Sequence, residues 1–251
     1  MLTLQIILLA IVPLAGVYYI KSVRGIHQKI NSRSEQNSRE ILAATRATKA
    51  DLLQSYRQTE AFNQLLALLK FTAPIPPTRN WAASPDLLLM IVDLVRTHKP
   101  RLVVELGSGV STLIVSKSGA KKTISIDNSE EYAVMTRAML KAHSVRGVEV
   151  RVAELKPHAL GVDWYDTTKL TNLKGIDLLI IDGPPGGKNP NARMPALSEL
   201  IKALSSRAVI VIDDVNRDGE RALAEAFAKA LPNHVLTIYP HEKGTAIISP
   251  K

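Results

Sequence analysis

A glycine turn and a later carboxylate stand at the spacing of a nucleoside-binding site. An apolar run ends in the turn Gly107-Ser108-Gly109, and the next apolar run along the chain ends in Asp127. In sites of this kind a parallel strand delivers a tight turn to a helix N-terminus, and the following strand carries an acid to the height of a ribose. The pattern therefore predicts a nucleoside site at the carboxyl ends of two adjacent parallel strands.

The residues around the turn indicate which kind of nucleoside would bind. A dinucleotide site has a third glycine, which lets the helix pack closely while its N-terminus holds a pyrophosphate, but Thr112 occupies that position. Glu105, two residues before the first glycine, would repel a pyrophosphate and can accept hydrogen bonds from an ammonium group. Both residues favour S-adenosylmethionine over a nicotinamide dinucleotide, so an NAD-dependent oxidoreductase is a disfavoured alternative.

These residues resemble the first two motifs of class I S-adenosylmethionine-dependent methyltransferases, here Val-Val-Glu-Leu-Gly-Ser-Gly at 103–109 and Ile-Ser-Ile-Asp at 124–127. The resemblance implies that the glycine turn approaches the cofactor, that Glu105 lies near its methionine end, and that Asp127 binds the ribose hydroxyls. It also implies that Glu154 contacts the adenine. The cofactor-binding residues implied in this way are Glu105, Gly107, Ser108, Gly109, Asp127, Glu154 and Asp182.

Further runs of strand length predict the rest of an α/β domain. Continuous apolar runs are typical of strands buried on both faces of a parallel sheet, and the last two runs are joined by a short Gly-containing connection that suits an antiparallel pair. We expect a Rossmann-like, seven-stranded methyltransferase sheet with helices on both faces. The predicted strands are residues 102–106, 123–126, 148–152, 176–181, 208–212, 234–239 and 245–249. The predicted helices cover residues 84–95, 129–142, 192–204 and 219–231.

Three further acids follow the fourth and fifth predicted strands. Asp182, Asp213 and Asp214 should meet at the carboxyl edge of the sheet, where open α/β sheets bind ligands. Their strand positions resemble those of the cation-dependent O-methyltransferases, which implies a magnesium ion that holds the substrate oxygens. The second acid of the pair replaces the usual asparagine. In the alternative reading, Asp182 caps a turn and faces the cofactor, while the other two acids cap the next helix.

Three residues are candidates for a direct catalytic role: His158, His241 and Asp182. Both histidines fall in loops predicted at the active edge, and either would take up a hydroxyl proton near neutral pH. Lys188 and Arg193 follow the Asp182 turn in a segment rich in Gly, Pro and Asn. They are candidates for holding an anionic substrate, the alternative being solvated loop charges.

A closer resemblance rests on three short segments: Asp-Gly-Pro-Pro-Gly at 182–186, Trp-Tyr-Asp at 164–166 and Trp-x-x-Ser-Pro at 81–85. Together they are similar to a bacterial group of methyltransferase-domain proteins associated with surface polysaccharide or glycolipid loci. The resemblance covers about residues 72–251. It implies a class of protein and not a substrate. Our hypothesis for the reaction is methyl transfer to an oxygen, a hydroxyl of a small molecule, a glycan or a glycolipid. The alternative from a different class is a membrane scaffold with a catalytically inactive methyltransferase fold.

The N-terminus predicts a membrane anchor. Residues 2–20 carry no charge, and the segment is long enough for one tilted helix through a bilayer. Basic residues such as Lys21 and Arg24 follow immediately. The positive-inside rule then places the rest of the chain in the cytoplasm. A cleaved signal peptide is the alternative, but the segment lacks a basic region before the apolar stretch.

The remaining sequence divides into a predicted helical stalk, residues 21–71, and a catalytic domain, residues 72–251, after the anchor at 1–20. The stalk offers a route to a homo-oligomer, although its apolar spacing is irregular for a coiled coil. The chain is basic, with a formal net charge of +9, which suits anionic lipid headgroups. Nucleic acid is a disfavoured partner because no aromatic-interleaved basic patch is apparent. The chain has no cysteine, which excludes disulfides and thiolate sites.

Overall fold

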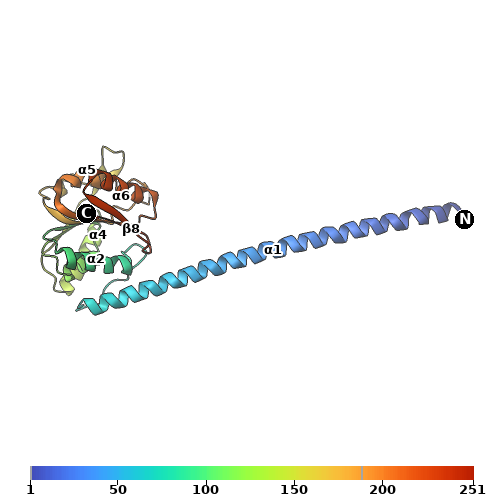
Figure 1. Ribbon diagram of the computed structural model, residues 1–251, viewed down its shortest axis with the longest axis horizontal. Coiled ribbons are helices and arrows are strands. Elements are labelled where there is room, and N and C mark those ends of the chain that lie inside the picture. The colour runs from blue at the N-terminus through green and yellow to red at the C-terminus, as the bar shows by residue number, and fades with distance from the viewer. Residues whose placement is uncertain (1, 188) are drawn as a thin grey trace. The chain divides into compact units, whose positions relative to one another are not determined.

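The computed structural model describes residues 2–187 and 189–251, with the side chains of residues 2–6 and 8–10 outside the described part. Lys188, one of the two candidates for holding an anionic substrate, also lies outside it. The chain divides into two compact units, Met1–Ser55 and Tyr56–Lys251. A continuous helix, α1 (Leu2–Leu68), makes up the first unit and contributes its last turns to the second (Figure 1).

The first unit contains the predicted anchor and much of the predicted stalk. Helix α1 runs through both without a break, with Pro13 inside it. Within the part of the chain that is described, no helix is both long and apolar enough to cross a bilayer. Most side chains of the first half of the predicted anchor lie outside that part, so the anchor stays a prediction.

The second unit contains a seven-stranded mixed sheet, which confirms that part of the predicted fold. The strand order is β3-β2-β1-β6-β7-β9-β8. Neighbours from β3 to β7 are parallel, whereas β9 runs antiparallel to both β7 and β8. The strands are β1 (Val103–Leu106), β2 (Thr123–Asp127), β3 (Val148–Val152), β6 (Ile176–Ile181), β7 (Leu204–Asp213), β8 (His234–Tyr239) and β9 (Thr245–Pro250).

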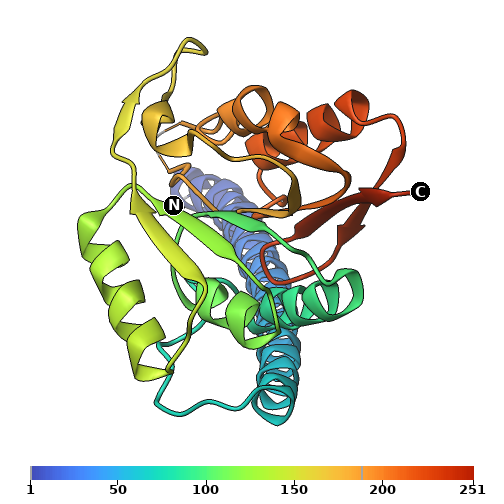
Figure 2. The same cartoon turned by 90° about the vertical axis from the view of Figure 1, so that its left-hand side faces the viewer.

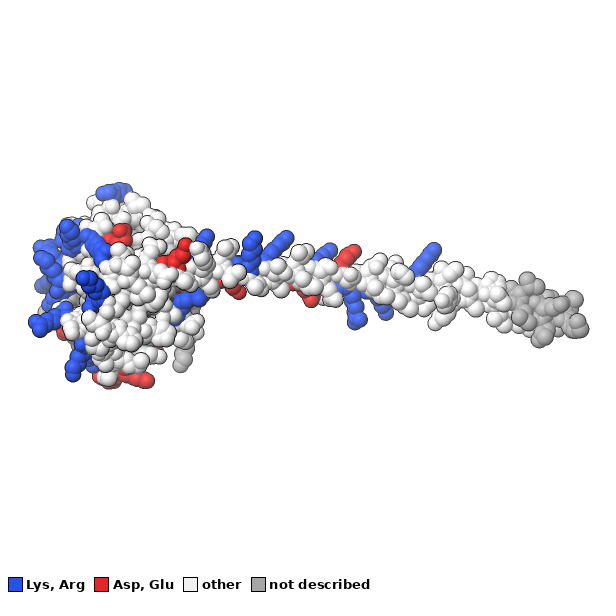
Figure 3. All heavy atoms as spheres, turned by 90° about the horizontal axis from the view of Figure 1, so that it is seen from below, with Lys and Arg blue, Asp and Glu red and all other residues white. Residues whose placement is uncertain are grey.

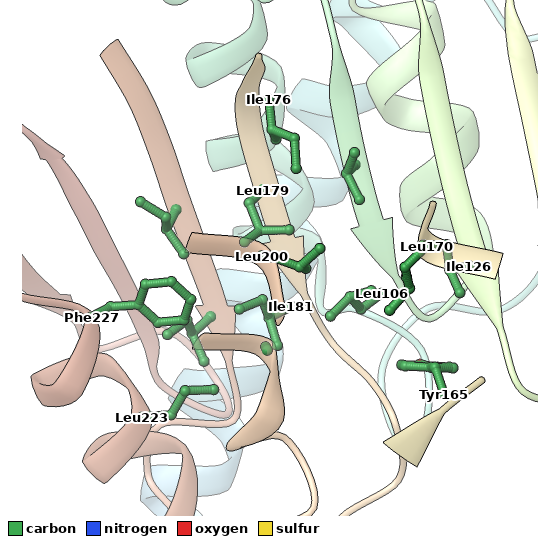
Figure 4. Packing of buried hydrophobic residues seen from close by; sticks show 14 of the residues in the cluster. Leu106, Ile126, Tyr165, Leu170, Ile176, Leu179, Ile181, Leu200, Leu223 and Phe227 are labelled. Carbon is green, nitrogen blue, oxygen red and sulfur yellow. The ribbon is translucent and has the colours of Figure 1, made fainter. Parts of the chain in front are cut away.

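Helices cover both faces of the sheet (Figure 2). They are α2 (Pro85–His98), α3 (Val110–Lys117), α4 (Glu130–Ala142), α5 (Pro195–Leu200) and α6 (Asp218–Ala230), with short 3-10 helices η1 (Thr167–Leu170) and η2 (Ile201–Ala203). Strand residues alternate between two cores, because successive side chains point to opposite faces. Leu106 and Ile181 pack with Phe227 of α6 (Figure 4), whereas Val103 and Leu178 pack against α2 and α3.

The last turns of α1 belong to this second core. Leu65 is fully buried in it, and Gln58 donates a hydrogen bond from Nε2 to Asp86 Oδ2 in the first turn of α2, at 2.7 Å. Ser84 precedes α2 and Pro85 opens it, as predicted. The globular unit therefore includes the last turns of a helix that was predicted to belong to the stalk.

One predicted helix is much shorter in the structure, and one hairpin was not predicted. The helix predicted at 192–204 spans only Pro195–Leu200, and β7 begins at Leu204. The early part of β7 is polar and partly exposed, so it gave no apolar signal. A short antiparallel hairpin, β4 (Leu155–Pro157) with β5 (Asp163–Tyr165), was not predicted, because its strands are three residues long and β4 is exposed.

Lys and Arg side chains gather at one end of the globular unit (Figure 3). The loops that precede the parallel strands carry cations at exposed positions, so the positive charge lies at the end opposite the carboxyl edge. These cations are Lys99, Arg101, Lys121, Lys122, Arg146, Lys174 and Lys202.

Candidate cofactor and active site

The glycine turn between β1 and α3 is closely packed on one side and open on the other. Gly107 donates its N–H to Ile126 O at 2.8 Å and has a φ of 93°, a region that favours glycine. A Cβ on Gly107 would lie 3.2 Å from Asp182 O, whereas a Cβ on Gly109 would meet no atom within 4 Å. The turn thus fits tightly against the end of β6 and leaves space beside Gly109.

Asp127 fastens this turn to the end of β2. Its Oδ2 accepts hydrogen bonds from Ser108 N at 2.8 Å and Ser108 Oγ at 2.6 Å, and its Oδ1 accepts from Ser129 N at 2.9 Å. The residue is only 5% exposed. The structure therefore brings together the turn and the acid that were predicted to bind one nucleoside.

Glu105 lies beneath the turn and is fully buried. Its Oε2 accepts from Thr112 Oγ1 at 2.5 Å and from Ser125 Oγ at 2.8 Å, and Thr112 Oγ1 in turn accepts from Gly109 N at 3.1 Å. Burial raises the pKa of Glu105 to about 6, although the hydroxyls of Ser111, Thr112 and Ser125 lower it. Thr112, which replaces the third glycine, is thus a structural link between the acid and the turn.

Tyr165 is a residue at this edge whose role sequence reasoning missed. The hairpin places its side chain below the ends of β1 and β2, near Leu106 (Figure 4). It is 1% exposed, and its hydroxyl has no hydrogen-bond partner among the residues that the structure describes. A Cβ on Gly183 would overlap that hydroxyl. Burial, and then the charge of Asp127, holds the pKa of Tyr165 well above its ordinary value. The Trp-Tyr-Asp run drew attention to this segment without indicating a buried, unpaired hydroxyl.

Glu154 lies at the start of the same hairpin. Its side chain is exposed, and its carbonyl oxygen accepts from Asp166 N at 2.9 Å. Its neighbour Ala153 is buried and donates its N–H to Asp127 O at 2.8 Å. The backbone at the predicted adenine position is therefore tied to the predicted ribose position.

The three predicted metal ligands also meet. Oxygen atoms of Asp182, Asp213 and Asp214 lie within 4.8 Å of one another at the ends of β6 and β7. Asp213 and Asp214 are 1% and 3% exposed. Burial, and then the charge of Asp213, raises the pKa of Asp182 to about 8. Three carboxylates this close require compensation by positive charge or by protons.

Arg193 supplies part of that compensation from within the cluster. It is 4% exposed, and its Nη2 lies 2.9 Å from Asp214 Oδ2 and 3.4 Å from Asp182 Oδ1. Its guanidinium also donates to the carbonyl oxygens of Asp182, Pro184 and Asp213, at 3.0, 3.2 and 3.2 Å. The alternative that Arg193 is a solvated loop charge was therefore wrong, because Arg193 is a buried ion-pair partner.

Lys243 and Arg217 add two more cations. Lys243 Nζ lies 2.7 Å from Asp213 Oδ2 and 3.4 Å from Asp214 Oδ1. Arg217 pairs with Asp214 Oδ2 at 2.6 Å and with Glu220 Oε1 at 3.3 Å. Each of the three predicted metal ligands is therefore already paired with a side-chain cation.

Comparison with known proteins identifies this unit. A sequence model described as a methyltransferase domain matches residues 104–215, which run from β1 to the loop after β7 and include the glycine turn, Asp127 and all three clustered acids. Over these residues the globular unit matches a methyltransferase domain in sequence. No curated protein matches the chain.

Solved methyltransferase structures share the fold of this domain at low sequence identity. The S-adenosylhomocysteine-bound methyltransferase of Podospora anserina is 17% identical, with a TM-score of 0.56, covering 81% of this chain and 95% of that one. An O-methyltransferase of Bacillus cereus in complex with S-adenosylhomocysteine is 17% identical, with a TM-score of 0.55, covering 80% and 97%. An O-methyltransferase of Streptomyces achromogenes in complex with S-adenosylmethionine is 17% identical, with a TM-score of 0.51, covering 68% and 82%.

The two candidate histidines occupy different places in the methyltransferase domain. His241 is half-buried, stacks on Tyr239 and shares a hydrogen bond between its Nδ1 and Thr245 Oγ1 at 2.9 Å. Burial lowers its pKa, whereas the charges of Asp86 and Asp213 raise it. His158 lies in the hairpin and pairs with Glu199 of α5, at 3.2 Å. Of the two, His241 is the one on which the charge of the acid cluster acts.

Proposed function

We propose that the methyltransferase domain transfers a methyl group from S-adenosylmethionine to a hydroxyl oxygen. The observation that carries the proposal is the buried Tyr165 hydroxyl beside the glycine turn, which has no hydrogen-bond partner among the described residues. Buried polar groups in folded proteins nearly always have partners, so unpaired ones at a ligand-binding edge indicate groups that bind a ligand. The O-methyltransferase neighbours share this fold.

The residues at this edge fit the proposed cofactor. The open side of Gly109 gives room for close approach of a ligand, and Asp127 offers carboxylate lone pairs to ribose hydroxyls at the end of β2. Neither Asp127 nor Glu105 forms an ion pair within the described residues, so their negative charge can attract a ligand with ammonium and sulfonium groups. When bound, S-adenosylmethionine would supply an activated methyl group on sulfur.

The chain's own residues would position the acceptor and take its proton. In-line transfer to an oxygen forms a C–O bond as the S–C bond breaks, so it depends mainly on alignment and on removal of the hydroxyl proton. We assign the proton to His241 Nε2. Its lowered pKa keeps the ring neutral near pH 7, and an Nδ1–H that donates to Thr245 would leave Nε2 as an acceptor.

The acceptor and the membrane context belong to this proposal. We infer a hydroxyl of a small molecule, glycan or glycolipid, reached from the cytoplasmic side of a membrane to which residues 2–20 anchor the chain. The uncharged segment followed at once by Lys21 and Arg24 supports the anchor, and exposed apolar residues along α1 allow self-association. Fractionation of cells that express the full chain, with and without residues 2–20, tests the anchor.

Calorimetric titration of the full chain tests the cofactor. We expect micromolar binding of S-adenosylmethionine and S-adenosylhomocysteine and no binding of NAD. Gly107→Val and Asp127→Ala should abolish binding, while Asp93→Ala, at an exposed position on α2, should retain it. Binding of NAD alone would favour the oxidoreductase, and no binding at all would favour the inactive scaffold.

A further inference from the structure

We infer that the cluster of Asp182, Asp213 and Asp214 is built around resident side-chain cations, with Lys243 in the place that a divalent metal takes in cation-dependent enzymes. The domain would then carry out its reaction without a metal ion at this position. The inference concerns the site of the proposed function but rests on the ion pairs alone.

The backbone holds Lys243 opposite the acids. Lys243 lies in the connection between β8 and β9, and its carbonyl oxygen accepts from Asn216 N at 3.1 Å, while Gly244 O accepts from Val215 N at 3.2 Å. Gly244 has a φ of 74°, and a Cβ there would lie 2.5 Å from Asn216 Oδ1. The loop that carries the lysine is thus fastened to the loop that follows the two acids, which fixes the ammonium beside Asp213.

The charges of the cluster are close to balanced. Among the described residues, four acids meet three cations through ion pairs of 2.6 to 3.6 Å. A divalent ion added to this set would leave excess positive charge in a mostly buried site, which is unfavourable where screening by water is weak. The four acids are Asp182, Asp213, Asp214 and Glu220, and the three cations are Arg193, Arg217 and Lys243.

The departure from the family pattern has a structural reason. Cation-dependent O-methyltransferases have an asparagine where this chain has Asp214. Here the carboxylate of Asp214 pairs with Arg193, Arg217 and Lys243, at 2.9, 2.6 and 3.4 Å. The extra negative charge is therefore neutralised by ion pairs, so a carboxylate at this position needs no metal ion as a partner.

Removal of Lys243 should convert the cluster into a metal site. Asp213 Oδ1 makes no hydrogen bond with any described residue, and loss of the ammonium would leave the whole carboxylate without a described cation beside Asp182. Oxygen ligands at this separation suit a hard divalent ion. The wild type, with the Lys243 ammonium in place, should therefore bind no divalent ion at this cluster. A variant without that ammonium should bind one.

The experiment measures binding of Mn²⁺ to the full chain by electron paramagnetic resonance, with no cofactor present. We expect negligible binding to the wild type and to Lys243→Arg, which keeps the charge. Lys243→Met should bind one ion at least about tenfold more tightly, because an opposing unit charge has been removed. Asp213→Asn in the Lys243→Met background should abolish that binding. Lys156→Met removes a different paired lysine, 2.6 Å from Asp166, and should behave as the wild type.

Two outcomes would overturn the inference. One is tight Mn²⁺ binding by the wild type that Asp213→Asn removes. The other is a folded Lys243→Met chain that binds no better than the wild type. If Lys243→Met does not fold, as judged by tryptophan fluorescence, Lys243→Gln takes its place. Because the readout is ion binding without cofactor, failure of this inference is separate from failure to bind S-adenosylmethionine.

Discussion

The two halves of the carboxyl edge hold their carboxylates in different ways. In the half formed by β1 and β2, Glu105 and Asp127 are held by hydroxyls and backbone N–H groups, and neither forms an ion pair within the described residues. In the half formed by β6, β7 and β9, Asp182, Asp213 and Asp214 are each paired with a cation. Neutral donors hold the first pair of acids, so we call the half formed by β1 and β2 the neutral half. Ion pairs hold the second set, so we call the half formed by β6, β7 and β9 the charged half.

The difference indicates which half is free to attract a ligand. A carboxylate held by neutral donors keeps its net charge, so it can attract an ammonium or a sulfonium group brought to the edge. A carboxylate paired with a buried guanidinium is already neutralised within the protein, so it attracts a charged ligand less strongly. The first half therefore suits a positively charged cofactor, and the second half suits a neutral acceptor that approaches a balanced set of charges.

The largest expected effect comes from breaking the charged half. Arg193→Met should lower the free energy of unfolding of the globular unit by about 3–5 kcal/mol, because it removes one partner of a buried ion-pair set and leaves the acids uncompensated. Urea unfolding followed by tryptophan fluorescence measures this, since Trp81 and Trp164 both lie in the globular unit.

Arg221→Met is the matched control for Arg193→Met. Arg221 is exposed on α6, and its replacement should change the free energy of unfolding by less than about 0.5 kcal/mol. If Arg193→Met cost as little as the control, the acids would be balanced by protons and not by the guanidinium, and the contrast between the two halves would disappear.

The second prediction concerns pH and the neutral half. The pKa of Glu105 is about 6 in the folded state against 4.5 in the unfolded chain, so the folded state binds the proton more tightly. Stability should therefore fall as pH rises from about 4.5 to about 6, by about 2 kcal/mol from this one group. Glu105→Gln keeps an acceptor for Thr112 and Ser125 and should lack that part of the slope.

Urea unfolding at a series of pH values compares the two chains. Glu131→Gln, an exposed position on α4, is the control and should keep the wild-type slope. If Glu105→Gln kept the wild-type slope as well, burial would not raise the pKa of Glu105. The hydroxyls around Glu105 would then stabilise its charged form as well as water does.

Local patterns were enough to predict most of the sheet. The strands at 148–152, 176–181 and 234–239 were predicted with the bounds they have, because apolar and β-branched residues mark them and turn residues bound them. The meeting of Asp182 with Asp213 followed from the rule that carboxyl ends of parallel strands share an edge.

The partners of those acids could not be predicted in the same way. Arg193 reaches Asp214 and Glu220 from a loop earlier in the chain, and Lys243 reaches Asp213 from the last strand connection. Nothing in the neighbouring sequence of either cation indicates such a partner, because the pairing depends on how distant segments pack. The unpaired hydroxyl of Tyr165 depends in the same way on a hairpin too short to give a periodic signal.

The smallest expected effect tests whether an unpaired group in the neutral half belongs to the ligand. Tyr165→Phe removes a buried hydroxyl without a partner, so it should raise the free energy of unfolding of the ligand-free chain by about 1 kcal/mol and the melting temperature by about 2–4 °C. The same change should weaken binding of S-adenosylmethionine, because the ligand loses a donor. Tyr132→Phe, at an exposed position, should change neither quantity.

A rise in stability with unchanged affinity would show that the Tyr165 hydroxyl is a packing defect. A fall in both would show that the hydroxyl has a partner within the protein. Opposite changes in stability and affinity are expected of a group that the fold leaves unpaired for a ligand.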